Sequence, residues 1–248
     1  MARTDFTTPR LCIADDLAEG RAVALTPEAA NYLVNVLRLE AGARVLCFNG
    51  RDGEFAAALD LTRRKHPALD IGERTRPQEF PPDVDYWFAP LKHARLDYMA
   101  QKAVEMGARR LVPVLTRRTQ TSRVNLERLV TNAREACEQC GVIWLPEVAE
   151  SLPLDKALSG LAPERLLVFC DEDAPLANPL EALAAAPDSA AGVTLLIGPE
   201  GGFDENERAA ILRTPRVLRL NLGPRILRAD TAAVAALALI QSRFGDWS

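Results

Sequence analysis

The sequence predicts an α/β protein in which a small β-rich unit precedes a larger domain built on a parallel sheet. Short strand-like runs dominate residues 10–75, whereas apolar runs of strand length alternate with amphipathic helices after residue 84, which is typical of a parallel sheet covered by helices. A proline-rich stretch with little periodicity, residues 74–85, separates the two patterns. We therefore expect a first domain over residues 1–75, a linker over residues 76–83 and a second domain over residues 84–248.

The bulk composition is that of an ordinary globular protein, with 48% hydrophobic and 26% charged residues. A formal net charge of −4 excludes a wholly basic nucleic-acid coat protein, although it does not describe local patches. Five cysteines, an odd number, do not suggest a disulfide-built secreted fold. Residues 1–5 lack a signal-peptide core, and the longest apolar run, residues 232–240, is too short to cross a bilayer. We expect a cytoplasmic protein with no membrane partner.

In the first domain, one short helix is expected among several strands. Thr26, Pro27 and Glu28 supply a hydroxyl cap, a first-turn proline and an early acid, which together indicate a helix start. This helix would place Tyr32, Leu33, Val36 and Leu37 on one apolar face and would end near Leu39 or Glu40. The turn-forming residues 49–53 predict a hairpin. The expected strands cover residues 10–14, 21–25, 44–48 and 54–59.

The second domain is expected to alternate strands and helices. Asp204 and Glu207 have the spacing of a capping box, which predicts a helix over residues 205–213. The last helix, about 230–244, is rich in alanine and leucine and is expected to be buried against the sheet or a second subunit. The expected strands are residues 84–91, 110–115, 165–170, 192–197 and 217–222.

Two of these strands break at a Gly-Pro pair. Residues 198–202 read Gly-Pro-Glu-Gly-Gly, and residues 222–224 read Leu-Gly-Pro. Neither stretch is a Walker A loop or a Gly-x-Gly-x-x-Gly fingerprint. Glycine lets a ligand approach backbone N–H groups without a Cβ in the way, and ligands of open α/β sheets bind at the carboxyl ends of strands. Two such breaks in adjacent strands predict one ligand pocket.

Other candidate chemistry is less well supported. Cys137 and Cys140 lie on the apolar stripe of a helix, and no second cysteine pair exists, so core packing is favoured over a metal or redox site. No metal is expected, and no Gly-x-Ser-x-Gly elbow supports a hydrolase.

The basic residues have two possible interpretations. The basic run 63–66 is either a solvated strand end or a phosphate-contacting patch. Taken singly, each arginine is explained as a solvated charge; several near the glycine pocket would suit a substrate with phosphates and a developing oxyanion. They are Arg117, Arg118, Arg123, Arg225 and Arg228.

These motifs resemble the RsmE family, SPOUT-class methyltransferases that modify N3 of a uridine in small-subunit ribosomal RNA. The resemblance rests mainly on residues 196–203 with Glu207, and on Leu222-Gly-Pro-Arg-Ile-Leu-Arg-Ala-Asp-Thr-Ala232. Residues 101–107 and 135–139 also match, and residues 36–39 with Gly42, Asn49 and Gly50 resemble the family's PUA-like domain. Asn31, Val142 and Asp230 depart from the His, Arg and Glu that are common in the family.

The resemblance implies a PUA-like β-barrel RNA-binding domain followed by a SPOUT domain with a trefoil knot, acting as a homodimer on 16S ribosomal RNA or the small subunit. It implies S-adenosylmethionine (SAM) as cofactor, bound by Ile197, Gly198, Pro199, Glu200, Gly201, Leu222, Gly223, Ile226 and Leu227. Arg228 is expected first, and then Arg118, to orient the base or stabilise its anion, with Glu200 as a base or a SAM contact. The expected RNA contacts are Arg10, Arg38, Arg63, Arg64, Lys65, Lys92 and Arg225. Another SPOUT activity (ribose 2′-O or guanine N1 methylation) and a non-enzymatic RNA-binding protein are the alternatives.

Overall fold

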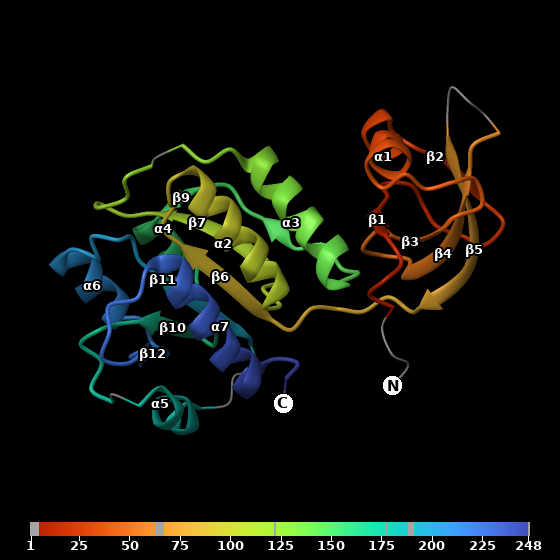
Figure 1. Ribbon diagram of the computed structural model, residues 1–248. Coiled ribbons are helices and arrows are strands. Elements are labelled where there is room, and N and C mark those ends of the chain that lie inside the picture. Colours follow the sequence, from red (N-terminus) through yellow and green to blue (C-terminus); the bar gives the residue numbers. More distant parts are fainter. Residues whose placement is uncertain (1–4, 63–66, 122, 177, 188–190, 248) are drawn as a thin grey trace. The chain divides into compact units, whose positions relative to one another are not determined.

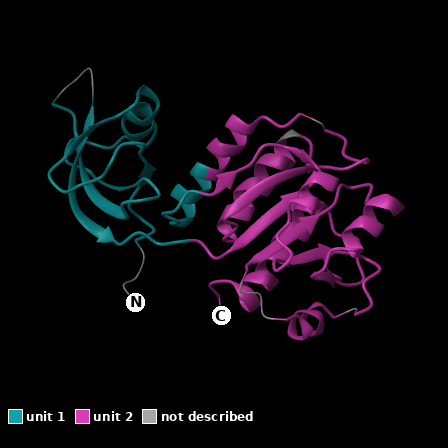
Figure 2. Cartoon of the chain, turned by 180° about the vertical axis from the view of Figure 1, so that it is seen from behind, with its two compact units in different colours: residues 1–80, 134–145 teal, residues 81–133, 146–248 magenta. Residues whose placement is uncertain are grey.

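The computed structural model describes residues 5–62, 67–121, 123–176, 178–187 and 191–247. The chain divides into two compact units, which Figure 2 shows in different colours. Unit 1 comprises residues 1–80 and 134–145, and unit 2 comprises residues 81–133 and 146–248. Each unit contains its own cluster of buried apolar side chains.

Unit 1 is a curled five-stranded sheet in the order β1-β3-β4-β5-β2 (Figure 1). Strand β1 pairs with β3 in parallel, and the other neighbours are antiparallel. The predicted turn at residues 49–53 joins β3 to β4 as a hairpin, so that expectation is confirmed. Strand β5 was not expected, because its second half is exposed and charged and lacks a regular apolar period. The strands are β1 (Arg10–Cys12), β2 (Ala22–Ala24), β3 (Arg44–Phe48), β4 (Glu54–Asp60) and β5 (Ala68–Arg76).

The helix of unit 1 begins where the sequence predicts but ends earlier. In α1 (Pro27–Asn31) the hydroxyl of Thr26 accepts a hydrogen bond of 3.2 Å from the Ala29 amide. The chain then widens into a π-turn, η1 (Tyr32–Val36). Leu33 is fully buried, and Tyr32 and Leu37 are partly buried against the same core, but Val36 is 61% exposed, so the expected face is wrong at Val36. The reason is the wider turn, which rotates Val36 away from the position that a 3.6-residue period gives it.

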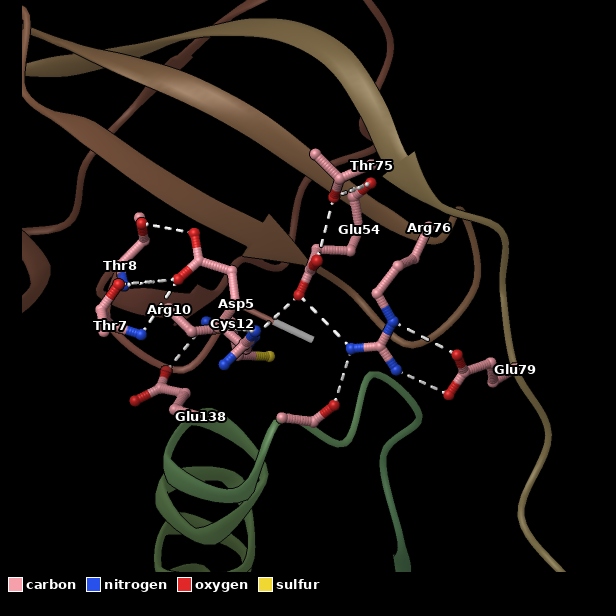
Figure 3. A network of polar contacts seen from close by, with 11 residues as sticks. Asp5, Thr7, Thr8, Arg10, Cys12, Glu54, Thr75, Arg76, Glu79 and Glu138 are labelled. Atoms are coloured by element: carbon pink, nitrogen blue, oxygen red, sulfur yellow. Dashed lines mark hydrogen bonds and ion pairs between the residues drawn. The ribbon is translucent and has the colours of Figure 1, made fainter. Parts of the chain in front are cut away.

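The chain segment 134–145 belongs to unit 1, which the sequence did not indicate (Figure 2). This segment holds the second half of α3 (Leu126–Cys140) and the turn after it. The carboxylate of Glu138 accepts a hydrogen bond of 2.8 Å from the Cys12 amide, and Arg76 donates one of 2.9 Å to the Gly141 carbonyl (Figure 3). These bonds attach the segment to the ends of β1 and β5.

Unit 2 contains a parallel sheet in the order β12-β10-β11-β6-β7-β8, with the short strand β9 also paired to β7. The five predicted strands are all present, and their ends shift by a few residues at most. The alternation of strands and helices therefore predicted the parallel sheet correctly. The strands are β6 (Val84–Phe88), β7 (Arg110–Leu115), β8 (Glu147–Val148), β9 (Leu152–Pro153), β10 (Leu166–Cys170), β11 (Val193–Ile197) and β12 (Val217–Leu220).

Helices cover both faces of this sheet (Figure 1). Successive strand residues point to opposite faces. Tyr86 on β6 donates a hydrogen bond of 2.9 Å to the sulfur of Met99 on α2, whereas Trp87 packs with Leu154 of α4 and Ile211 of α6. Helix α7 packs against α2, α5 and β11, so it is buried against the sheet side as one of the two expected alternatives. The remaining helices of unit 2 are α2 (His93–Glu105), α4 (Leu154–Ser159), α5 (Pro179–Ala185), α6 (Glu205–Leu212) and α7 (Ala229–Phe244).

No helix in the described part of the chain combines the length and the apolarity that a membrane span requires.

Candidate functional site

Both glycine loops lie at the carboxyl edge of the unit 2 sheet. Strands β10, β11 and β12 are parallel, so the loops that follow them emerge at one edge. The expectation that the two loops follow adjacent strands is wrong, because β10 lies between β11 and β12. The reason is that β10 pairs with both of them, which sequence spacing could not show. The chain that leaves β10, residues 171–176, therefore begins between the two glycine loops along this edge.

The first glycine loop, residues 198–202, forms a tight turn after β11. The amide of Gly202 donates a hydrogen bond of 2.8 Å to the Pro199 carbonyl, and Gly202 has a φ of +69°, which favours glycine. Ile197 and Pro199 are buried, whereas Glu200 and Gly201 are exposed. The turn therefore presents its backbone and the Glu200 side chain at the sheet edge.

Gly198 is required for a different reason, namely close packing. A Cβ at this position would lie 2.6 Å from a ring carbon of Phe203, and that ring packs edge-on against Phe169 with centroids 5.4 Å apart. We expect Gly198→Ala to lower the free energy of unfolding by about 1–3 kcal/mol, because the ring must move within a packed core. Gly201→Ala is the matched control, since its Cβ would meet Arg118 at an ordinary 3.5 Å.

Thermal unfolding of the two variants measures this difference. Adding Phe203→Leu to Gly198→Ala should recover part of the loss, because the smaller side chain leaves room for the new methyl group. Equal unfolding temperatures for Gly198→Ala and Gly201→Ala would contradict the packing explanation.

Arg118 lies against the first glycine loop and is held there by its neighbours. Its guanidinium donates a hydrogen bond of 2.6 Å to the Gly201 carbonyl. The adjacent residue, Arg117, is clamped by the start of α6: its amide donates to the Glu207 carboxylate at 2.7 Å, and its guanidinium is 3.1 Å from Asp204. The predicted capping box between Asp204 and Glu207 is confirmed. It therefore caps α6 and also fixes the loop that carries Arg118.

The second glycine loop, residues 221–228, leads from β12 into α7. The side chain of Asn221 accepts a hydrogen bond of 2.8 Å from the Gly223 amide, and Gly223 has a φ of +99°. Leu222 and Leu227 are half-buried, while Ile226 is 96% exposed. Arg225 and Arg228 are exposed at the same edge of the sheet. The loop thus presents apolar and cationic side chains together.

Asp171, which the sequence did not single out, connects α6 with β12 beside the glycine loops. This buried carboxylate accepts hydrogen bonds of 2.9 Å from Arg208 and 2.6 Å from Arg219. Asn221 also donates to the Glu172 carbonyl at 3.0 Å. The available signal was an acidic run, residues 171–173, placed directly after a strand that ends at the same edge.

Glu200 of the first glycine loop forms an ion pair with Arg95 of α2. Both residues line a cavity of about 290 Å³ together with Lys92. Gln120, also on its wall, was not singled out by the sequence, since one glutamine in a loop carries no pattern.

Of the RNA contacts expected in unit 1, Arg10 is buried and Arg38 is exposed. The guanidinium of Arg10 is buried and donates a hydrogen bond of 2.7 Å to Glu54, so its expected phosphate contact is corrected to an internal ion pair (Figure 3). Arg38 is exposed and has a φ of 55°, an uncommon conformation for a residue other than glycine. Arg63, Arg64 and Lys65 lie outside the described residues.

The cysteines show no sign of reactive chemistry. Cys137 is buried and Cys140 is partly buried. Burial raises the pKa of the Cys12 thiol to about 11 and the pKa of the Cys170 thiol to about 12. In the described part of the chain, His, Cys, Asp and Glu side chains form no group of three or more that could hold a metal ion.

Comparison with known proteins agrees with this arrangement. Residues 78–241 match the family described as RNA methyltransferase domain, and residues 25–65 match the RNA methyltransferase PUA domain. The fold and these matches define the class of protein as RNA methyltransferases with a PUA-like domain.

Three relatives narrow the class. Ribosomal RNA small subunit methyltransferase E from a Synechocystis species is 33% identical and covers 94% of this chain and 77% of its own. The enzyme of that name from Neisseria gonorrhoeae, bound to S-adenosyl methionine, has a TM-score of 0.86 at 26% identity and covers 97% of this chain and 100% of its own. A methyltransferase from Legionella pneumophila in complex with SAM has a TM-score of 0.82 at 28% identity, with 96% and 99% coverage. The chain belongs to the ribosomal RNA small subunit methyltransferase E (RsmE) family.

Proposed function

We propose that this protein transfers the methyl group of SAM to N3 of a uridine in 16S ribosomal RNA. The supporting observation is the near full-length similarity to relatives that carry the name ribosomal RNA small subunit methyltransferase E, one of them bound to S-adenosyl methionine. The two glycine loops at one sheet edge are consistent with it. When bound, SAM supplies a methyl group that is already activated on a sulfonium.

The glycine loops fit such a ligand. A Cβ built on Gly202 or Gly223 would meet no heavy atom within 4 Å, so both loops border open space. The half-buried Leu222 and Leu227 offer apolar contacts, and the turns offer backbone groups. The residues proposed to hold SAM are Ile197, Gly198, Pro199, Glu200, Gly201, Leu222, Gly223, Ile226 and Leu227.

The chain's own task is alignment and charge stabilisation. The uracil N3–H must lose its proton as the N3–methyl bond forms, and negative charge then spreads over O2, O4 and N3. We assign the donation of hydrogen bonds to these oxygens to Arg228 and Arg118; the exposure of Arg228 and the contact of Arg118 with the first glycine loop support the assignment. Glu200 is proposed as the proton acceptor or as a contact to SAM; its ion pair with Arg95 restrains the carboxylate in either role.

RNA binding and assembly complete the proposal. N3 lies on the Watson–Crick edge, so the target must be unpaired or flipped out. We assign the gripping of RNA to residues 1–75, through Arg38 and the basic run 63–66, with residues 76–83 as linker and residues 84–248 as the methyl-transfer domain. Lys92 and Arg225 would contact RNA from this second domain. A trefoil knot, a homodimer and a cytoplasmic location belong to the same proposal.

Nucleoside analysis of ribosomal RNA tests the proposal. Digested 16S RNA from cells with and without the gene should differ by one N3-methyluridine, detected by mass spectrometry, and purified protein with SAM should restore it. Appearance of a 2′-O-methyl nucleoside or N1-methylguanosine instead would indicate another SPOUT activity. No SAM binding in a calorimetric titration would favour a non-enzymatic RNA-binding protein.

A further inference from the structure

A small cavity opens at the carboxyl ends of β6 and β11 in unit 2. Its volume is about 290 Å³, and its apolar walls include Pro90, Leu91 and Pro199. Small-molecule pockets generally measure about 300–1,000 Å³. The cavity therefore lies at the lower end of this range, a size that admits one planar base.

The cavity lies beside the first glycine loop. Strand β11 is flanked by β6 on one side and β10 on the other. Pro199 and Glu200 line the cavity on the β6 side, while the loops after β10 and β12 lie in the opposite direction along the sheet edge. The first glycine loop therefore borders the cavity and also lies on the sheet edge that carries the second glycine loop, so a base in the cavity would adjoin the residues proposed to hold SAM.

We propose that this cavity receives the base of the target uridine, with Lys92 and Gln120 contacting its carbonyl oxygens. The proposal rests on the proposed function and extends it to the substrate base. Pro90 and Pro199 offer flat apolar contacts for the faces of a ring. The base enters unpaired, as a nucleotide flipped out of its stack.

The polar rim of the cavity offers hydrogen-bond donors to uracil. Uracil presents carbonyl oxygens O2 and O4 on either side of N3. Lys92 and Arg95 can only donate hydrogen bonds, and the side-chain amide of Gln120 can donate as well, so these three side chains match the carbonyl oxygens.

The charge of the rim also suits the reaction. Arg95 is bound to the Glu200 carboxylate, which cancels its charge and holds Glu200 at the cavity wall. Lys92 is exposed and adds a second cation. The three ionised groups sum to one positive charge, which stabilises the uracil anion that forms when N3 loses its proton.

Methylation kinetics of the full-length protein test the assignment, with unmodified 16S RNA from cells lacking the gene as substrate. Lys92→Met and Gln120→Ala should lower kcat for methyl transfer by about a hundredfold each, as loss of a donor to a developing oxyanion does. The Kd for SAM should stay within twofold. Lys92→Arg, which keeps the donor, should recover most of the rate, and Lys156→Met, on the exposed face of α4, is the matched control.

A cross-linking experiment supplies a readout that does not depend on turnover. Small-subunit RNA transcribed with 4-thiouridine should cross-link to the peptide that contains residues 90–95 or residues 199–200, and Lys92→Met should weaken that adduct. Adducts confined to other peptides would overturn the proposal. So would wild-type rates for both variants, or a loss of SAM affinity in step with activity, which would assign the cavity to the cofactor.

An error in the proposed function and an error in the assignment of the cavity would give different results. If the wild-type protein binds SAM but produces no N3-methyluridine, the proposed function is wrong, and the position of the cross-link alone decides whether the cavity binds a uracil base. If N3-methyluridine forms and the cavity variants retain full activity, only the assignment of the cavity is wrong.

Discussion

Replacing Arg228 with alanine is expected to lower methyl transfer to ribosomal RNA by about a hundred- to a thousandfold while the Kd for SAM stays within twofold. The guanidinium is exposed beside the second glycine loop, and no described residue forms a hydrogen bond or ion pair with it. Its backbone carbonyl accepts the first helical bond of α7, at 2.8 Å from the Ala232 amide. Because truncation keeps this backbone bond, the loss falls on the reaction and not on the fold.

Single-turnover methylation and calorimetric SAM titration measure the two quantities separately. Arg213→Ala is the matched control, since Arg213 is an exposed arginine at the end of α6, away from the carboxyl edge. Arg228→Lys should retain part of the activity, because it keeps the charge but loses the planar fork of donors. Full turnover in Arg228→Ala with unchanged SAM affinity would remove Arg228 from the proposed mechanism.

The sequence was most informative where a pattern is local. The capping box at Asp204 and Glu207 and the glycine turn at residues 198–202 each depend on residues a few positions apart, and both are present as expected. The parallel sheet was equally accessible, because alternating apolar runs and amphipathic helices reflect the burial of strands on both faces.

What the sequence missed depends on contacts between distant residues. The order of β10, β11 and β12 follows from which strand edges pair, and strand spacing does not determine it. The role of Asp171 requires Arg208 and Arg219 to come from two other elements. The same holds for the pair of Arg95 and Glu200, which lie on α2 and in the loop after β11.

In unit 1, the expectation for Arg10 is wrong because an arginine side chain suggests a solvent-exposed position. Arginine is rarely buried unless it is paired, so the residue type predicts a surface contact to phosphate for Arg10. Its partner Glu54 lies on β4, beyond the reach of any local pattern. The sequence also predicts the second domain for segment 134–145, because a continuous helix gives no sign that its two halves belong to different units.

Replacing Arg10 with alanine is therefore expected to destabilise unit 1 by about 3–5 kcal/mol and to leave the SAM site intact. The side chains of Arg10 and Glu54 are only 2% and 3% exposed, and the Glu54 carboxylate also accepts a bond of 2.9 Å from Thr75 (Figure 3). Without Arg10, the carboxylate keeps a hydroxyl and a more distant guanidinium, Arg76 at 3.7 Å. These partners compensate only in part, which places the expected loss towards the lower end of the range.

Urea unfolding, together with hydrogen exchange of the β3 and β4 amides, measures this loss where it arises. Arg44→Ala, an exposed arginine on β3, should change stability by no more than about 0.5 kcal/mol. The double variant Arg10→Met with Glu54→Leu should recover most of the stability, because an apolar pair leaves no buried charge. If Arg10→Ala instead kept the wild-type unfolding curve and weakened RNA binding, Arg10 would be an RNA contact after all. The buried ion pair makes the opposite result the expected one.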